Sequence, residues 1–185
     1  MRHLIKFCRR RANEISRFGS ADRAATAVEF ALVAPAFIAV LVALLQTCIY
    51  LFAQMVIQNA AVEAGRYFMT GQAQNNNWTA STIVGKVCPS ALFTCSDMFL
   101  VVQNYSSFAS ASTSAPSMYN GGGQALTQSN YAFDAGTSGA VMVVQLVYAW
   151  PVVKAPFGFS LSNSSNNAAE LMGVSAFRVE PYQSN

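Results

Sequence analysis

The clearest pattern along the chain is one long apolar run near its start. Residues 30–45 include no charged or strongly polar side chain, and with Gln46 and Thr47 as small interruptions the apolar character continues to about Ile57. Crossing the hydrocarbon core of a bilayer takes roughly 20 helical residues. The run is also longer than the roughly 7 to 15 apolar residues of a signal peptide. It therefore predicts a transmembrane helix.

Helical spacing continues beyond the apolar run. Residues 54–70, QMVIQNAAVEAGRYFMT, keep apolar side chains at helical intervals and place polar side chains on one face. Glu63 and Arg66 lie three positions apart on this face, a spacing at which they can pair. Gly71, followed by polar residues, is a helix stop signal. We expect one helix over residues 25–69, about 65 Å long at about 1.5 Å per residue, which is twice the hydrocarbon thickness.

Beyond residue 78 the chain is rich in Ser, Thr, Asn and Gly, with short apolar runs between them. Three runs rich in β-branched and aromatic residues are predicted to form strands: residues 97–105, 140–150 and 171–181. Residues 79–91 are predicted to form a short helix or turn. Two turn-rich stretches are predicted to form long loops: residues 106–124 and 160–170.

The distribution of charge gives these elements an orientation. Charged residues make up only 10% of the chain, against about 25% in an ordinary soluble domain. Seven of the eleven Lys and Arg residues precede residue 24, where the only acidic residues are Glu14 and Asp22. A basic head followed by an apolar run places that head in the cytoplasm and exports the rest. A nucleic-acid-binding arm is the competing interpretation, and the apolar run that follows at once argues against it.

Together these patterns predict an α+β fold. A long N-terminal transmembrane α-helix extends into the periplasm and packs on a small antiparallel β-sheet head with long loops. We expect a single-pass inner-membrane protein with three parts: a basic cytoplasmic leader (1–24), a transmembrane and stalk helix (25–70) and a periplasmic α+β head (71–185).

Cysteine and histidine usage bounds the chemistry. Cys88 and Cys95 lie in the exported part, where oxidation is permitted, so a disulfide between them is one prediction. Two free thiols are the alternative. A zinc site is not expected, because the single histidine is His3 and no second cysteine pair accompanies these two. We therefore predict no metal and no cofactor.

Groups suited to catalysis are sparse. The predicted exported region has no histidine, which excludes a histidine-based triad there. Its carboxylates are scattered without the spacing of a paired acid and base: Asp97, Asp134, Glu170 and Glu180. No GxSxG motif occurs, and the NGGGQ stretch at 120–124 lacks the Lys-Ser/Thr that a phosphate-binding loop requires. We do not expect an enzyme.

One carboxylate stands at the start of the apolar run. In AATAVEFALVAP, Glu29 is flanked by small and apolar residues, and the next acidic residue is Glu63. A carboxylate at the lipid boundary is costly unless it stays hydrated or meets a cation, so Glu29 is a candidate functional residue. The alternative is an interface residue near Arg23 and lipid head groups, where its charge favours a helix N-terminus.

The same stretch resembles the start of the TadE-like pseudopilins, minor pilins of bacterial tight-adherence (Flp) type IV pilus systems. The resemblance implies that a prepilin peptidase cuts between Ala24 and Ala25, which makes Glu29 the fifth mature residue. There the carboxylate would neutralise the terminal amine of a neighbouring subunit, a pairing that low dielectric strengthens. Prepilin peptidases usually prefer glycine before the cut, where this chain has Ala24. An uncut, permanently anchored chain is the alternative.

The resemblance continues in QNAAVEAGRYFMTGQ (58–72) and, near the C-terminus, in VVQLVYAWPVV and AFRVEPY. It implies a minor pilin or pseudopilin that takes part in assembly of a Tad/Flp type IV pilus for surface adherence. The implied partners are other pilins and pseudopilins, the prepilin peptidase, the inner-membrane assembly platform and membrane lipid, without nucleic acid. Two other classes stay open: a single-pass anchor presenting a periplasmic binding or sensing module, and an exported enzyme.

Overall fold

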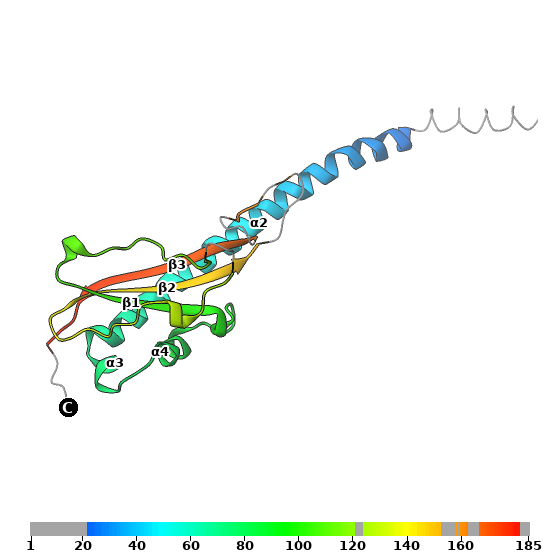
Figure 1. Ribbon diagram of the computed structural model, residues 1–185. Helices are drawn as coiled ribbons and strands as arrows, with labels where there is room; N and C mark the ends of the chain where they lie inside the picture. The colour runs from blue at the N-terminus through cyan, green and yellow to red at the C-terminus, as the bar shows by residue number, and fades with distance from the viewer. Residues whose placement is uncertain (1–21, 121–123, 153–157, 159, 163–166, 182–185) are drawn as a thin grey trace, which may run out of the picture. The chain divides into compact units, whose positions relative to one another are not determined.

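The computed structural model describes residues 22–120, 124–152, 158, 160–162 and 167–181 (Figure 1). The elements in chain order are α2 (Asp22–Met69), α3 (Gln72–Asn75), α4 (Ala80–Val87), β1 (Met98–Tyr105), β2 (Val141–Pro151) and β3 (Ala168–Arg178). Short 3-10 turns lie at Cys95–Asp97, Phe108–Ser110 and Gln128–Asn130. The chain divides into two compact units, residues 1–45 with 155–157 and residues 46–154 with 158–185. The described part of the second is called the head unit.

Helix α2 carries the apolar run and is continuous over 48 residues. Within the described part of the chain it is the one helix long and apolar enough to cross a membrane. Its predicted end at Met69 is confirmed, whereas the described helix already includes Asp22 and so begins before the predicted start. Gly71 follows with φ of 74°, a left-handed conformation that glycine adopts at little cost, and its N–H donates to Phe68 O at 3.1 Å.

The three strands form one antiparallel sheet in the order β1–β2–β3. The first two strands occupy nearly the predicted residues. β3 begins at Ala168 and ends at Arg178, so its predicted bounds are wrong at both ends, as is the predicted end of the preceding loop. The long strand β2 explains the shift, because it extends far enough for Ala169 to pair with Trp150. The predicted α+β fold, a long apolar helix followed by a small antiparallel sheet, is confirmed.

Two short helices follow α2. The predicted short helix is α4, and its N-cap is Thr79, whose hydroxyl oxygen accepts from the N–H of Thr82 at 3.3 Å. Helix α3 is not predicted by the sequence, because its four residues follow Gly71 directly in a stretch with the composition of a loop. The N–H of Trp78 donates to Ala73 O at 3.0 Å, which closes this small turn.

The part of α2 that belongs to the head unit packs on one face of the sheet at very short range. A Cβ built on Gly173 of β3 would overlap the carbonyl oxygen of Ile57 and stand 2.8 Å from the Cβ of Ala61. A Cβ on Gly65 of the helix would stand 2.6 Å from Ser175 Oγ. The buried core between them is made chiefly of small helix residues and large strand residues: Ala53, Ile57, Ala60, Ala61, Ala64, Phe68, Leu100, Val102, Met142, Val144, Leu146 and Leu171.

Glutamine side chains satisfy the outer edge of β3. Gln58 forms two hydrogen bonds with Val174, accepting from its N–H at 3.0 Å and donating to its carbonyl oxygen at 2.7 Å. Gln54, one helical turn earlier, donates to Met172 O at 2.7 Å. The side-chain amide of Gln58 thus takes the place of a neighbouring strand, which satisfies backbone groups that a buried edge cannot leave unpaired.

The outer edge of β1 is satisfied in the same way. Gln128 accepts from the N–H of Leu100 at 2.9 Å and donates to its carbonyl oxygen at 2.7 Å. Two positions along, Val102 donates to Ala132 O at 2.9 Å and accepts from the N–H of Asp134 at 3.0 Å. Each edge strand therefore has a glutamine amide acting as a local substitute for a strand.

The segment between β1 and β2 covers the second face of the sheet. Gln145, buried in the middle of β2, donates to Ser114 O at 3.0 Å, and the ring of Tyr131 stacks on Phe99 with centroids 5.5 Å apart. Burial, and then the negative charge of Glu170, raise the pKa of Tyr131, so its hydroxyl stays protonated and donates to a backbone carbonyl. Because both faces are covered, β2 is buried from Val141 to Tyr148.

The contact between helix and sheet is tested by adding one methyl group. We expect Gly173→Ala to lower the free energy of unfolding of the head by about 1–3 kcal/mol, because the new Cβ overlaps helix backbone that cannot move aside. The matched control is Gly85→Ala in α4, where a Cβ meets no atom within 4 Å and the gain in helix propensity is about 0.5–1 kcal/mol. Denaturant unfolding in detergent measures both, and equal stabilities for the two variants would contradict the packing.

Candidate functional site

The residues singled out by the sequence lie at the start of α2. The Ala24–Ala25 peptide bond is inside the helical backbone, since the described helix already includes Asp22. Glu29 is exposed on the following turn, between the exposed side chains of Val28 and Phe30. The structure therefore presents the carboxylate on the outer surface of an apolar helix, within about two turns of the predicted cut.

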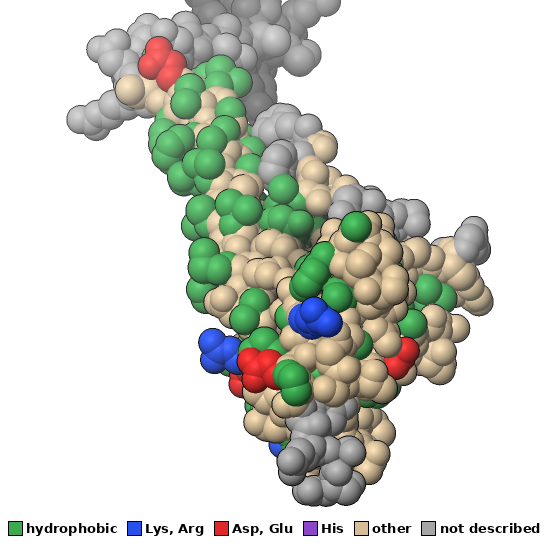
Figure 2. Space-filling model, turned by 90° about the vertical axis from the view of Figure 1, so that its left-hand side faces the viewer, with side chains coloured by type: hydrophobic (Ala, Val, Ile, Leu, Met, Phe, Trp, Pro, Cys, Tyr) green, Lys and Arg blue, Asp and Glu red, His purple; other side chains and the backbone are tan. Residues whose placement is uncertain are grey.

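The surface around Glu29 is suited to contact with lipid or with other helices. Apolar side chains cover most of the helix surface that is visible in Figure 2, and charged side chains gather on the visible face of the head unit. Large apolar residues of the helix are exposed from Val28 onward, among them Leu32, Phe37, Leu41, Leu45 and Ile49. An exposed apolar helix surface of this extent is not stable in water and needs a hydrophobic environment.

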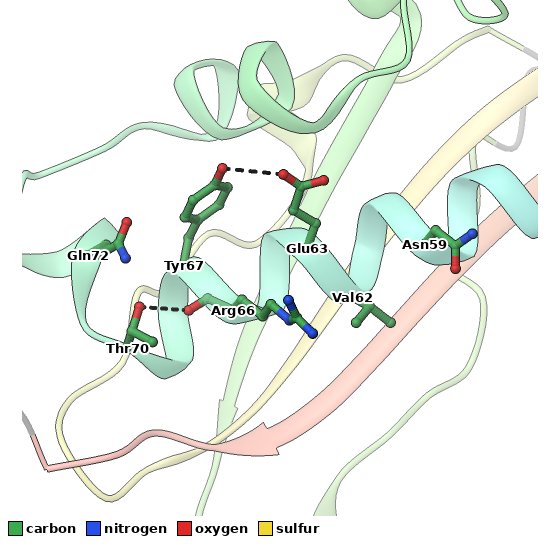
Figure 3. A pocket seen from close by; sticks show the side chains of 7 residues that line it. All are labelled: Asn59, Val62, Glu63, Arg66, Tyr67, Thr70 and Gln72. Atoms are coloured by element: carbon green, nitrogen blue, oxygen red, sulfur yellow. Dashed lines mark hydrogen bonds between the residues drawn. The ribbon is translucent and has the colours of Figure 1, made fainter.

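A second surface lies at the other end of α2. A hollow of about 510 Å³ is lined by residues of the last turns of the helix and the residue that begins α3: Asn59, Val62, Glu63, Arg66, Tyr67, Thr70 and Gln72 (Figure 3). The lining includes one carboxylate and one guanidinium. It has no second acid and no histidine, so it offers polar contacts but no acid and base pair.

Glu63 and Arg66, whose spacing allows an ion pair, do not form one in the described structure. Glu63 instead accepts from the hydroxyl of Tyr67 at 3.5 Å, and Arg66 points away from Glu63 (Figure 3). The physical reason is competition at helical spacing, because Tyr67 lies four residues after Glu63 and presents a donor on the same side. The hydroxyl of Thr70 donates to the backbone carbonyl of Arg66 at 2.9 Å.

The two cysteines of the loop between α4 and β1 are joined. Cys88 and Cys95 form a disulfide with Cα atoms 5.8 Å apart, which closes the loop between α4 and β1. Phe93 of this loop is buried and meets two aromatic residues of β2, with ring centroids 5.0 Å from Tyr148 and 5.8 Å from Trp150. The disulfide thus holds an aromatic cluster at one end of the sheet.

Several contacts of the site region escape sequence analysis. Lys86 lies over the ring of Trp78 at 4.4 Å, and Trp78 in turn meets Tyr67 edge to face at 5.3 Å. The sequence does include a sign of the contacts of Gln54 and Gln58. Two amides one turn apart in an otherwise apolar helix need hydrogen-bond partners if they are buried. Among the described residues, no group of three or more His, Cys, Asp or Glu side chains is placed to hold a metal ion.

Comparison with known families gives one result. Residues 24–66 match the family model described as TadE-like protein. The match begins at Ala24, includes Glu29 and ends at Arg66, so the resemblance predicted from this part of the chain is confirmed. It does not extend to the two C-terminal stretches, whose resemblance stays a prediction. No curated protein and no solved structure matches the chain.

The disulfide is tested by removing both of its sulfurs. We expect the Cys88→Ser/Cys95→Ser double variant to lose about 2 kcal/mol of unfolding free energy, because the unfolded chain regains the freedom of a short closed loop. Cys48→Ser is the control, since Cys48 is exposed and outside the disulfide. Denaturant unfolding with and without reductant compares the variants. If reduction left the stability of the unmodified chain unchanged, the disulfide would contribute nothing.

Proposed function

We propose that this chain, in which α2 matches the TadE-like proteins over residues 24–66, is a minor pilin or pseudopilin that takes part in assembly of a Tad/Flp type IV pilus for surface adherence. The observation that carries the proposal is the position of the match. It lies entirely within α2 and includes the carboxylate at the start of the apolar run. In this proposal the helix makes the contacts on which assembly depends, and the chain is not an enzyme.

In this proposal the basic leader stays in the cytoplasm and the head unit lies in the periplasm. The seven Lys and Arg residues before residue 24 support that orientation by the positive-inside rule. A prepilin peptidase cuts after Ala24, and the mature chain begins with the α-amine of Ala25. The peptide bond lies in helical backbone, so the peptidase must unwind a turn of α2 to reach it.

The chemistry of assembly is a charge pairing. In the bilayer, the exposed Glu29 carboxylate is next to hydrocarbon and is costly to keep ionised. In a fibre, a freed α-amine of an adjoining pilin lies at the same depth and neutralises it, in surroundings where the attraction is stronger than in water. Breaking such a pair by removing one partner typically costs about 3–5 kcal/mol, so the carboxylate favours the assembled state over the isolated subunit. Other pilins, the peptidase and the inner-membrane assembly platform are the partners that this proposal requires.

The proposed processing is tested on the native protein. Mass spectrometry of the membrane and pilus fractions should find a mature N-terminus at Ala25. A full-length chain in both fractions would contradict processing and would favour the single-pass anchor that presents a binding or sensing module.

The proposed pairing is tested by Glu29→Gln, which keeps the shape of the side chain and removes its charge. We expect processing to remain mostly intact and incorporation into pili to fall by about tenfold or more, given the cost of one lost buried ion pair. The control is Asp97→Asn, which removes an exposed carboxylate from the head unit and should leave both unchanged. Normal piliation by Glu29→Gln would overturn the pairing.

A further inference from the structure

We propose that one end of the head unit, formed by Trp150, Pro151, Val152 and Leu161, lies in the head-group region of the bilayer and is a lipid-binding surface. These four residues are called the membrane-facing end. The inference rests on the part of the proposed function that places α2 across a membrane. It goes beyond that function by making the exported head, and not only the helix, a partner of the lipid.

The membrane-facing end is next to the apolar part of α2. Its four residues line a hollow of about 190 Å³ together with Gln46 and Ile49 of the helix. Trp150 is half-buried and Pro151 is exposed. The apolar lining is thus continuous with the exposed apolar side chains of the helix, where Ile49 is followed by Leu51 and Phe52.

The length of the helix places this end at the membrane surface. Counting from Phe30, the first apolar residue after Glu29, about 20 residues are needed to cross a hydrocarbon core of about 30 Å, and the crossing ends at Ile49. The first contacts between the sheet end and α2 lie at the same residues. Ile49 lines the hollow described above, and Gln54, further along the helix, donates to Met172 O at 2.7 Å. A bilayer that rose further would immerse this polar contact in hydrocarbon, which is unfavourable.

The direction of the sheet identifies which of its ends lies beside the first residues of the head unit's part of α2. Strand β3 runs parallel to α2, since contacts advance together along both: Gln54 contacts Met172, Gln58 contacts Val174, and the N–H of Glu180 donates to Met69 O at 3.1 Å. From residue 54 to residue 69 the helix rises about 22 Å, and from 172 to 180 an extended chain covers about 26 Å, so the two match in length. The end of the sheet that contains Trp150 is therefore the end towards the apolar run.

The chemistry of this end suits the boundary between head groups and acyl chains. Tryptophan is enriched at that boundary, because its ring is apolar and its N–H is a hydrogen-bond donor that water or a lipid carbonyl satisfies. The ring of Trp150 packs against the rings of Phe93 and Tyr148, at centroid distances of 5.8 Å and 6.3 Å. Lipid is favoured over a protein partner because the surface is continuous with the helix surface that the bilayer already covers.

The chain provides its own control, since it has two tryptophans. Trp78 belongs to the same head unit, but its ring meets Tyr67, which is 18 residues beyond Ile49 along the helix and so about 27 Å further from the boundary. Trp78→Phe leaves Trp150 as the single fluorophore, and Trp150→Phe leaves Trp78. Both substitutions replace one aromatic ring by another, and the first does not alter the surface under test.

The experiment uses the full chain reconstituted into phosphatidylcholine vesicles, with and without lipids brominated on their acyl chains. We expect brominated lipid to quench the emission of the Trp78→Phe variant at least about threefold more strongly than that of the Trp150→Phe variant, and the emission of Trp150 to lie at shorter wavelength, as for an interfacial ring. Resistance to alkaline carbonate extraction reports in the same samples whether the helix is inserted.

Three outcomes would overturn the inference. If the chain resists extraction and Trp150 is quenched no more than Trp78, the head does not touch the bilayer, while the membrane placement of α2 survives. If brominated lipid does not quench the emission of Trp150, but that emission changes with the ratio of protein to lipid, a second copy of the chain covers this end. If carbonate extracts the chain, the membrane placement in the proposed function fails, and this inference fails with it.

Discussion

The architecture depends on how closely one strand approaches one helix. Gly173 of β3 lies against the backbone of α2 at Ile57, where no side chain can be accommodated, and the amide of the next helix residue, Gln58, bonds to both backbone groups of Val174. Neither contact is made by bulky apolar side chains, so the helix and strand backbones lie closer together than a layer of such side chains would allow. The short distance gives the helix and strand a fixed register, because a shift of one residue would place a Cβ against backbone and break both hydrogen bonds.

Helix α2 combines two different surfaces in one element. The same helix that is apolar over its first half becomes the central core element of the head over its second half, with small residues such as Ala53, Ala61 and Ala64 facing the sheet. A soluble head alone would expose this alanine stripe, and the helix alone would lose the partners of its two glutamines. The head is therefore a structure built around the end of a long apolar helix and not a domain attached to it by a linker.

The sequence predicts the parts of this structure that repeat a simple pattern. An uninterrupted apolar run and a glycine stop give α2 and its end, and β-branched runs give β1 and β2. The start of β3 is not predictable, since Ala168 and Ala169 have no strand preference and become a strand only because β2 extends opposite them. Sequence also does not settle the partner of Glu63, because Tyr67 and Arg66 are both near it on the helix and only the packed rotamers decide between them. Of the candidate site, Glu29 is indicated by its position in an apolar stretch, whereas Ala24 and Ala25 are indicated only by the family resemblance. The spacing of Cys88 and Cys95 leaves their state open, and they form a disulfide in the structure.

The glutamine amides at the two sheet edges limit how such molecules can associate. Gln128 bonds to the backbone N–H and carbonyl of Leu100 in β1, and Gln58 bonds to those of Val174 in β3. These backbone groups in the middle of each edge strand are therefore not available to pair with an incoming strand. Polymers that grow by strand donation, in which each subunit completes the sheet of the next, need such groups to be free. Any assembly of these subunits would therefore have to gain its cohesion from contacts other than strand pairing at the middle of these two edges.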